Sequence, residues 1–260
     1  RAVLNALFDK ESFIELGSFV SETDAAESVV TGYGTISGRL VYTYAQDIAV
    51  LGGSLGDAAT KKISDIIDMA IKTGSPIVSI LNSNGVRIDE GVNVLASIGK
   101  NLLKSAKVSG VIPQISFVTG PCAGGAVFTA GLADFVFMPE GKSSIFLTGP
   151  AVTEGLTGVP TDAASLGGAT SCAERGAAHF VYKTEDDCIL GIKKLLSFLP
   201  SNNLESPPIF SSNDDVNRQL PNLISLIPDD NSPYDILPVI KEIVDDNDFF
   251  EVSGSFAQNL

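Results

Sequence analysis

The chain has 260 residues, 44% of them hydrophobic, so it can bury one large core or one core and part of a second. Its 31 acidic residues outnumber its 17 basic ones and give a formal charge of −14 at pH 7. This charge repels the phosphates of nucleic acids and the headgroups of anionic lipids, which argues against a nucleic-acid-binding protein and against contact with a membrane.

Strand patterns and helix patterns alternate along the first 200 residues. Val-, Ile-, Tyr- and Thr-rich stretches at 29–37 and 39–49 flank Ser37-Gly38, a pair typical of a hairpin turn. The alternation predicts an α/β fold with a largely parallel, covered sheet. The further expected strands are 76–81, 112–118, 135–138 and 144–146, and the expected helices are 57–71, 91–106, 125–132, 162–166 and 185–198.

After residue 199 the chain becomes rich in Pro, Ser, Asn and Asp, a composition typical of connectors. Beyond it, a helix is expected at 234–244 and a strand at 249–256, too little to enclose a core. We therefore predict a domain over 1–200, a linker over 201–231, and the start of a second, truncated domain over 232–260.

An apolar strand beginning near Val118 runs directly into Gly124, Gly125 and Ala126 and then into a helix-forming stretch. A helix start has unpaired N–H groups and a partial positive charge, and glycines let a reacting group approach them closely. Such a turn suits a negatively charged oxygen, for example that of a thioester enolate. The alternative is that the two glycines only let the helix pack tightly on the strand.

A second glycine-rich segment, Gly52-Gly53-Ser54-Leu55-Gly56, lies between an expected strand at 48–51 and the helix at 57–71. It matches the Gly-x-Ser-x-Gly elbow of serine hydrolases, with Ser54 as nucleophile, Asp89 or Asp134 as orienting residue and His179 as base. Alternatively, the loop lies against a ligand, and Ser54 caps the helix.

Two further side chains, those of Arg87 and His179, are candidate functional groups, and each also has a purely structural interpretation. Arg87 follows a strand and the Asn84-Gly85 turn, so a strand-end loop could present it to a ligand, or it could pair with Asp89 or Glu90 at the surface. His179 is the only histidine, and a single histidine among small and apolar residues is more often a structural hydrogen-bonding group than a base.

The three cysteines, Cys122, Cys172 and Cys188, are odd in number and widely spaced. They form no Cys-x-x-Cys pair, and with one histidine they give no ligand set for a metal site. The uncharged stretch 108–133 is interrupted by prolines and glycines, which argues against a membrane span. No signal-peptide pattern opens the chain, and we expect a cytoplasmic protein.

Several ordered motifs together resemble one family, the biotin-dependent acyl-CoA carboxyltransferases. This family includes the β subunits of propionyl-CoA and acetyl-CoA carboxylases and the α subunits of related decarboxylases. The resemblance covers about 7–203, and 232–260 resembles the opening of the family's second half. It rests on Ala45-Gln46-Asp47, Gly52–Gly56, Arg87-Ile88-Asp89-Glu90-Gly91, Gly110–Ser116, Gly120–Val127, Thr148-Gly149-Pro150 and Leu166-Gly167-Gly168-Ala169.

The resemblance implies a crotonase-like (ClpP/crotonase) fold of stacked β-β-α units that binds acyl-CoA. Gly124, Gly125 and Ala126 would stabilise the thioester enolate, and Gly52, Gly53, Ser54, Gly85 and Arg87 would line the CoA site. The implied co-substrate is carboxybiotin on a separate carrier, since no Met-Lys-Met-type acceptor occurs here. The implied partners are a biotin carboxyl carrier or biotin carboxylase subunit and further copies of the chain.

The chain also departs from the family pattern. Members usually read Asp-Ser-Gly-Gly-Ala-Arg where this chain has Asn82-Ser83-Asn84-Gly85-Val86-Arg87, which adds side chains near the acyl-CoA. Cys172 stands near a position where a histidine is common, in a stretch one residue short. The altered 82–87 loop and the truncated second domain leave a non-catalytic assembly module as an alternative to the carboxyltransferase, and the Ser54 elbow leaves a serine hydrolase.

Overall fold

The computed structural model describes residues 1–20, 27–212, 214–215 and 217–258. The chain divides into two compact units, one made of 1–207 and 253–260 and the other of 208–252. The predicted domain limits, 1–200 and 232–260 with a linker between them, stay a prediction, because compactness alone does not make a segment an independent domain.

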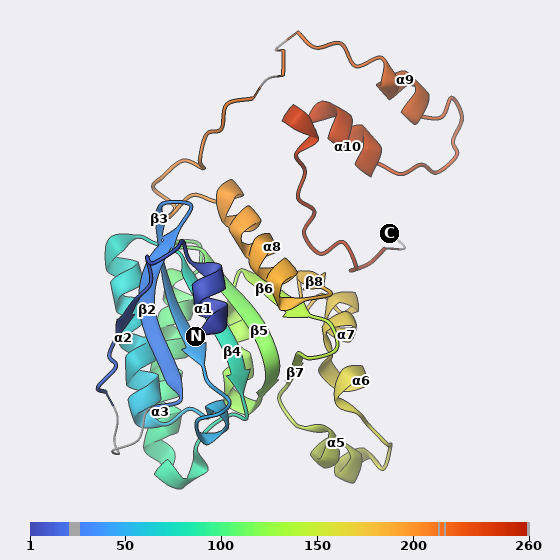
Figure 1. Cartoon of the computed structure of the whole chain (residues 1–260). Coiled ribbons are helices and arrows are strands. Elements are labelled where there is room, and N and C mark those ends of the chain that lie inside the picture. The colour runs from blue at the N-terminus through green and yellow to red at the C-terminus, as the bar shows by residue number, and fades with distance from the viewer. Residues whose placement is uncertain (21–26, 213, 216, 259–260) are drawn as a thin grey trace. The chain divides into compact units, whose positions relative to one another are not determined.

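One sheet organises the first unit. Its strands follow the order β1-β2-β3-β4-β5-β6-β8, with β7 paired to β5 (Figure 1). The pairs β1–β2 and β2–β3 are antiparallel, and all the other pairs are parallel. The strands are β1 (Ile14–Leu16), β2 (Val29–Ile36), β3 (Arg39–Gln46), β4 (Ile77–Ser83), β5 (Gln114–Ala123), β6 (Phe135–Pro139), β7 (Ser144–Phe146) and β8 (Phe180–Tyr182).

Helices cover this sheet, as the alternating pattern predicts. Helix α2 packs on β2 and β3 and against α3, while α8 packs on β5, β6 and β8 and contacts α1 (Figure 1). Strand β4 is buried along nearly its whole length, as expected of a parallel strand covered on both faces. The helices are α1 (Ala2–Leu7), α2 (Asp57–Thr73), α3 (Val92–Val108), α4 (Val127–Leu132), α5 (Pro150–Thr157), α6 (Ala163–Gly167), α7 (Ala169–Glu174) and α8 (Glu185–Phe198).

The hairpin between β2 and β3 confirms the turn expected at Ser37-Gly38. Ser37 and Gly38 have φ angles of 52° and 76°, and left-handed conformations at both central positions match the twist of the flanking strands. Asp9 fixes this turn from outside, because its carboxylate accepts hydrogen bonds from the N–H groups of Ser37 (3.0 Å) and Gly38 (2.9 Å).

The expected strand at 48–51 is wrong. Strand β3 ends at Gln46, and Asp47 then closes a turn by accepting the N–H groups of Ala49 and Val50. The 3₁₀ turn η1 (Leu51–Gly53) follows, in which Leu51, Gly52 and Gly53 have φ angles of 49°, 66° and 64°. Three consecutive left-handed residues cannot continue an extended strand.

The expected strand at 249–256 is also wrong, since 249–251 is irregular and 252–256 forms bends and turns. Ser253 has a φ angle of 58°, and its N–H donates to the carbonyl of His179 (3.0 Å). The left-handed residue turns the chain where the alternating apolar pattern predicted an extended segment.

The second unit contains α9 (Asn222–Leu226), α10 (Leu237–Ile243) and the turn η4 (Asp245–Asn247). Arg218 holds this unit together, because its guanidinium pairs with Asp214 (3.3 Å) and donates to the carbonyl of Glu242 (2.9 Å). Helix α10 confirms the expected helix at 234–244 with a later start.

Candidate functional site

The turn that follows β5 has the layout predicted from the sequence. Strand β5 leads into the 3₁₀ turn η3 (Gly124–Ala126), and α4 begins at Val127. Gly124 has a φ angle of 59°, a conformation that favours glycine. The N–H of Gly125 donates to no acceptor among the residues that the structure describes, so it is available to a ligand.

A second segment faces this turn from the end of β4. Gly85 has a φ angle of 108°, and a Cβ placed on it would lie 3.2 Å from the carbonyl oxygen of Ala123. A Cβ placed on Gly125 would lie 2.9 Å from Cγ2 of Val86. The Val86 N–H, like that of Gly125, has no acceptor within the described ranges. Two backbone donors from neighbouring strand ends are thus available side by side, an arrangement that can hold one carbonyl or enolate oxygen.

The glycine-rich segment before α2 fixes this second donor. Leu55 and Val86 form an isolated parallel bridge, in which the Leu55 N–H donates to the carbonyl of Gly85 (2.8 Å) and the Arg87 N–H to that of Leu55 (3.0 Å). Gly53 must be glycine, because a Cβ there would lie 2.1 Å from the carbonyl oxygen of Asn82. The Gly52–Gly56 segment is therefore packed directly against the segment that carries Val86.

Ser54 lacks the surroundings of a hydrolase nucleophile. It follows a 3₁₀ turn and not a strand, and its hydroxyl donates to the carbonyl of Leu51 (2.6 Å) and accepts from Nε of Arg87 (3.1 Å). The expected cap by Ser54 is wrong, since Gly56 is the N-cap of α2 and the first N–H of that helix, at Asp57, donates to the Glu90 carboxylate (2.6 Å).

The other groups of the hydrolase interpretation have structural partners of their own. Nδ1 of His179 accepts the N–H of Val136 (3.0 Å), and burial lowers the pKa of this imidazole despite the nearby charge of Asp134. The Asp134 carboxylate accepts the N–H of Gln114 (2.8 Å). No hydrogen bond between Ser54 and His179 occurs in the described part of the chain.

Arg87 lies in a cluster of its own. Its side chain is 15% exposed and pairs with Glu27, whose side chain is 3% exposed, and with Glu90 (3.1 Å). The alternative pair with Glu90 therefore forms, largely buried, and no sequence pattern pointed to Glu27.

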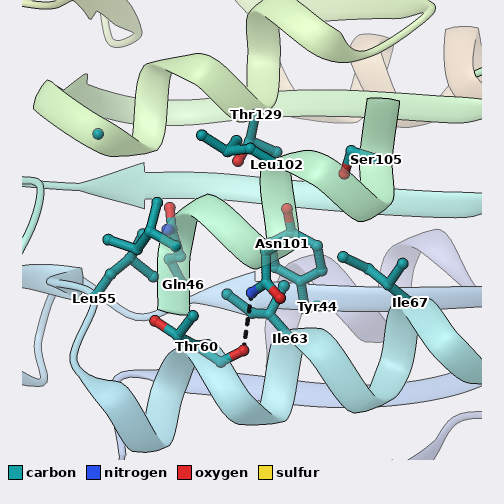
Figure 2. Close-up of a pocket in the computed structure, with 12 residues that line it drawn as sticks. Tyr44, Gln46, Leu55, Thr60, Ile63, Ile67, Asn101, Leu102, Ser105 and Thr129 are labelled. Carbon is teal, nitrogen blue, oxygen red and sulfur yellow. Dashed lines mark hydrogen bonds between the residues drawn. The ribbon is translucent and has the colours of Figure 1, made fainter. Parts of the chain in front are cut away.

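A small cavity lies behind the Gly125 turn, between α2, α3 and the sheet. Its volume is about 20 Å³, which is enough for one water molecule and too small for an acyl chain. Figure 2 shows Tyr44, Asn101 and Thr129 among its lining residues, and the side-chain amide of Asn101 donates to the carbonyl of Thr60 (2.9 Å). Burial raises the pKa of Tyr44 to about 12, so this wall stays uncharged at neutral pH.

The three departures in the segment 82–87 each place a side chain against a glycine. A Cβ on Gly120 would lie 2.6 Å from Oδ1 of Asn82, and one on Gly52 would lie 2.6 Å from Nδ2 of Asn84. Val86 packs beside Gly125 in the same way. The added side chains thus fill space next to the site.

The cysteines and possible metal ligands carry no chemistry that the structure supports. Cys122, Cys172 and Cys188 are free and buried, and burial raises the pKa of Cys122 and of Cys188 to about 12. The Cys172 thiol donates to the carbonyl of Gly167 (3.2 Å). Among the described residues, no three His, Cys, Asp or Glu side chains gather as metal ligands, and no helix there is both long and apolar enough to span a membrane.

Sequence reasoning missed two residues of this site, Val86 and Glu27. Val86 offers its backbone N–H, which no side-chain motif reports. Only its position in the chain could have indicated it: Val86 follows a glycine just after β4, and the neighbouring strand β5 ends at the Gly124–Ala126 turn. Glu27 lies 60 residues from Arg87, and one sequence holds no record of that pairing.

The largely parallel sheet, with two free N–H donors at the ends of adjacent strands, is that of a crotonase-like α/β protein. The chain matches the carboxyl transferase domain family over residues 1–260 and belongs to that family. It is 47% identical over 272 residues to the methylmalonyl-CoA decarboxylase subunit alpha of Veillonella parvula, and the match covers 100% of this chain and 53% of that protein. It is 41% identical to the propionyl-CoA carboxylase beta chain of Roseobacter denitrificans, again over 100% of this chain and 53% of the relative.

A solved structure has the same fold over the whole chain. The crystal structure of transcarboxylase 12S with hydrolyzed methylmalonyl-coenzyme A bound superposes with a TM-score of 0.95 at 40% identity, covering 100% of this chain and 52% of that one. The predicted crotonase-like fold is confirmed. The chain spans about half the length of the curated relatives that it matches.

Proposed function

We propose that this chain is the acyl-CoA-binding part of a biotin-dependent acyl-CoA carboxyltransferase. The observation that carries the proposal is the pair of free N–H groups at Gly125 and Val86, which suits a thioester oxygen. Family membership supports it, and the relatives are named for methylmalonyl-CoA decarboxylation and propionyl-CoA carboxylation.

The chemical role of this donor pair is to stabilise charge. Removal of an α-proton from a thioester moves negative charge onto the carbonyl oxygen, and two fixed donors stabilise that charge without having to reorganise. Carboxybiotin, as the second substrate, would supply both the carboxyl group and the base. No side chain near the turn then has to act as the base. This agrees with Ser54 and His179, which are hydrogen-bonded to other residues of the chain.

The CoA moiety is proposed to lie along Gly52, Gly53 and Gly85. These residues have left-handed conformations; Gly52 and Gly53 lie against 82–84, and Gly85 lies beside Ala123 and Gly124. The same prediction for Ser54 and Arg87 has less support, because both side chains bond to other residues of the chain. Gly124 and Ala126 stay predicted neighbours of the enolate oxygen.

The partners proposed for the chain are a biotin carboxyl carrier or biotin carboxylase subunit and further copies of itself. The structure of transcarboxylase 12S is described as a hexamer and as a multienzyme core, and this supports self-association. A cytoplasmic location is proposed in addition, and the three free, buried cysteines are compatible with a reducing compartment.

Calorimetric titration tests the proposal with propionyl-CoA and with S-propyl-CoA, a thioether that lacks the carbonyl oxygen. We expect propionyl-CoA to bind about thirtyfold more tightly, since the thioether loses both hydrogen bonds and each contributes about 1 kcal/mol. Equal affinity for the two compounds would contradict the placement of the thioester oxygen between Gly125 and Val86. Failure of the folded chain to bind either compound, or free CoA, would contradict the CoA site.

A further inference from the structure

A network of polar contacts near the site surrounds Arg87. Its Nε donates to the Ser54 hydroxyl (3.1 Å). Its Nη1 donates to the carboxylates of Glu27 (3.3 Å) and Glu90 (3.1 Å). Its Nη2 donates to the Glu27 carboxylate, to the Ser28 hydroxyl (2.9 Å) and to the Ser54 carbonyl (3.1 Å). A guanidinium has five N–H groups, and each of them has an acceptor here. We name Glu27, Ser28, Ser54, Arg87 and Glu90 the Arg87 cluster.

The charge of the Arg87 cluster disfavours contact with a CoA phosphate. The cluster combines one guanidinium with two carboxylates, so its net charge at neutral pH is negative. Burial opposes the charged form of Glu27, but the hydrogen bonds from Arg87 and from the Ser28 N–H outweigh it, and the pKa of Glu27 is lowered. Burial likewise opposes the charge on Arg87, and its bonds to Glu27 and Glu90 raise its pKa. Both partners therefore stay charged and paired.

The cluster ties together three segments that surround the Val86 donor. Glu27 and Ser28 precede β2, Ser54 lies in the glycine-rich segment, and Glu90 lies in the 3₁₀ turn η2 (Ile88–Glu90). Ser28 adds a direct link, because its hydroxyl donates to the Ser54 carbonyl (2.6 Å). Glu90 extends the network to the start of α2 through the N–H of Asp57 (2.6 Å).

The backbone transmits this restraint to Val86. The carbonyl of Gly85 and the N–H of Arg87, on either side of Val86, are both bonded to Leu55, the residue after Ser54. The peptide that contains the Val86 N–H is thus held at its neighbours, and its own N–H is left for a ligand. A rotation of this peptide would break the bond of the Gly85 carbonyl to Leu55, and Leu55 follows Ser54, which the Arg87 side chain holds.

We propose that Arg87 is a positioning residue: paired with Glu27, it holds the Val86 N–H beside the Gly125 N–H, and it does not contact the CoA. This inference rests on the proposed function, since the oxygen held by the two donors is that of the thioester. It predicts that loss of the pair weakens the polarisation of the thioester carbonyl and leaves the affinity for the CoA moiety unchanged.

Isotope-edited infrared difference spectra measure that polarisation directly, using propionyl-CoA with a ¹²C or ¹³C carbonyl. Hydrogen bonds from two N–H groups lower the stretching frequency of the bound carbonyl relative to that of the free thioester. In Arg87→Met we expect about half of this lowering to disappear, because the Gly125 N–H stays in place, and propionyl-CoA to bind about fivefold more weakly, the effect of one hydrogen bond. Binding of free CoA, measured by calorimetry, is expected to stay unchanged.

Two further variants keep the test decisive. Arg87→Met leaves Glu27 buried and unpaired, which can unfold the chain, so the neutral double variant Glu27→Gln/Arg87→Met serves as the second test and is expected to show the same spectral loss. Lys104→Met is the matched control, because it breaks the pair between Lys104 and Asp68 (2.6 Å), which joins α3 to α2 away from the cluster, and should leave the spectrum unchanged.

The outcomes separate this proposal from the proposed function. A wild-type carbonyl frequency equal to that of the free thioester would contradict the proposed function itself. A lowered wild-type frequency that both folded Arg87 variants retain would overturn the positioning role. Equal weakening of free CoA and propionyl-CoA in the variants would instead make Arg87 a CoA contact and also overturn it.

Discussion

Adding one methyl group at Gly125 should disturb the donor pair in a defined way. The φ angle of Gly125 lies outside the left-handed region, so alanine is compatible with its backbone. The new Cβ would lie 2.9 Å from Cγ2 of Val86, a distance that forces Val86 to shift and carries the Val86 N–H with it. We expect Gly125→Ala to lose one hydrogen bond to the thioester, which lowers the affinity for propionyl-CoA about fivefold. The rate of any reaction through the enolate should fall by about 10²–10³.

The assay is calorimetric titration with propionyl-CoA and with free CoA, after urea unfolding has shown that each variant is folded. Gly131→Ala is the matched control, because it adds the same methyl group in α4, where a Cβ meets no atom within 4 Å. The double variant Gly125→Ala/Val86→Ala removes the colliding methyl groups and should regain most of the affinity. Unchanged affinity in Gly125→Ala, or no recovery in the double variant, would refute this reasoning.

Three further predictions follow from the packing and charges around the site. Because the pKa of Glu27 is lowered in the fold, its contribution to stability is present above its usual value of 4.5 and is lost as the pH falls. The free energy of unfolding of Glu27→Gln should be about 3–5 kcal/mol lower than that of the wild type at pH 7. As the pH falls, the variant should lose less stability than the wild type does, and urea titrations of both proteins from pH 7 to acid measure the two effects. Val86→Ala should raise the affinity for branched isobutyryl-CoA relative to acetyl-CoA, and an unchanged ratio of dissociation constants would speak against Val86 as a wall of the acyl site. A fluorophosphonate should leave Ser54 unlabelled, as read by mass spectrometry, because its hydroxyl donates to the Leu51 carbonyl (2.6 Å); stoichiometric labelling would restore the hydrolase.

The sequence predicted the parts of the fold that local patterns control. Helices α2, α3 and α8 and the β2–β3 hairpin follow from apolar periodicity and from turn residues, and their observed ends lie within a few residues of those expected. The segment at 48–51 was misassigned because its apolar residues resemble a strand. There Asp47 closes a turn and three left-handed residues follow, which a pattern of side-chain polarity does not report.

The site was predictable where glycine identity itself carries information. Gly53, Gly85 and Gly124 stand where a left-handed backbone or a close approach excludes other residues, so the glycine motifs led to turns that lie close together in the structure. The partners across the turns were not predictable, because the contact of Val86 with Gly125 and the pairing of Arg87 with Glu27 depend on how distant strands come together. A single sequence holds no record of such contacts.

A crystal structure of the chain with bound propionyl-CoA would test the central claim most directly. The account predicts the thioester oxygen within about 2.7–3.1 Å of both the Gly125 and the Val86 backbone nitrogens, with Arg87 still on Glu27. A thioester oxygen bound elsewhere, or one held by a side chain such as Ser54 or His179, would contradict it.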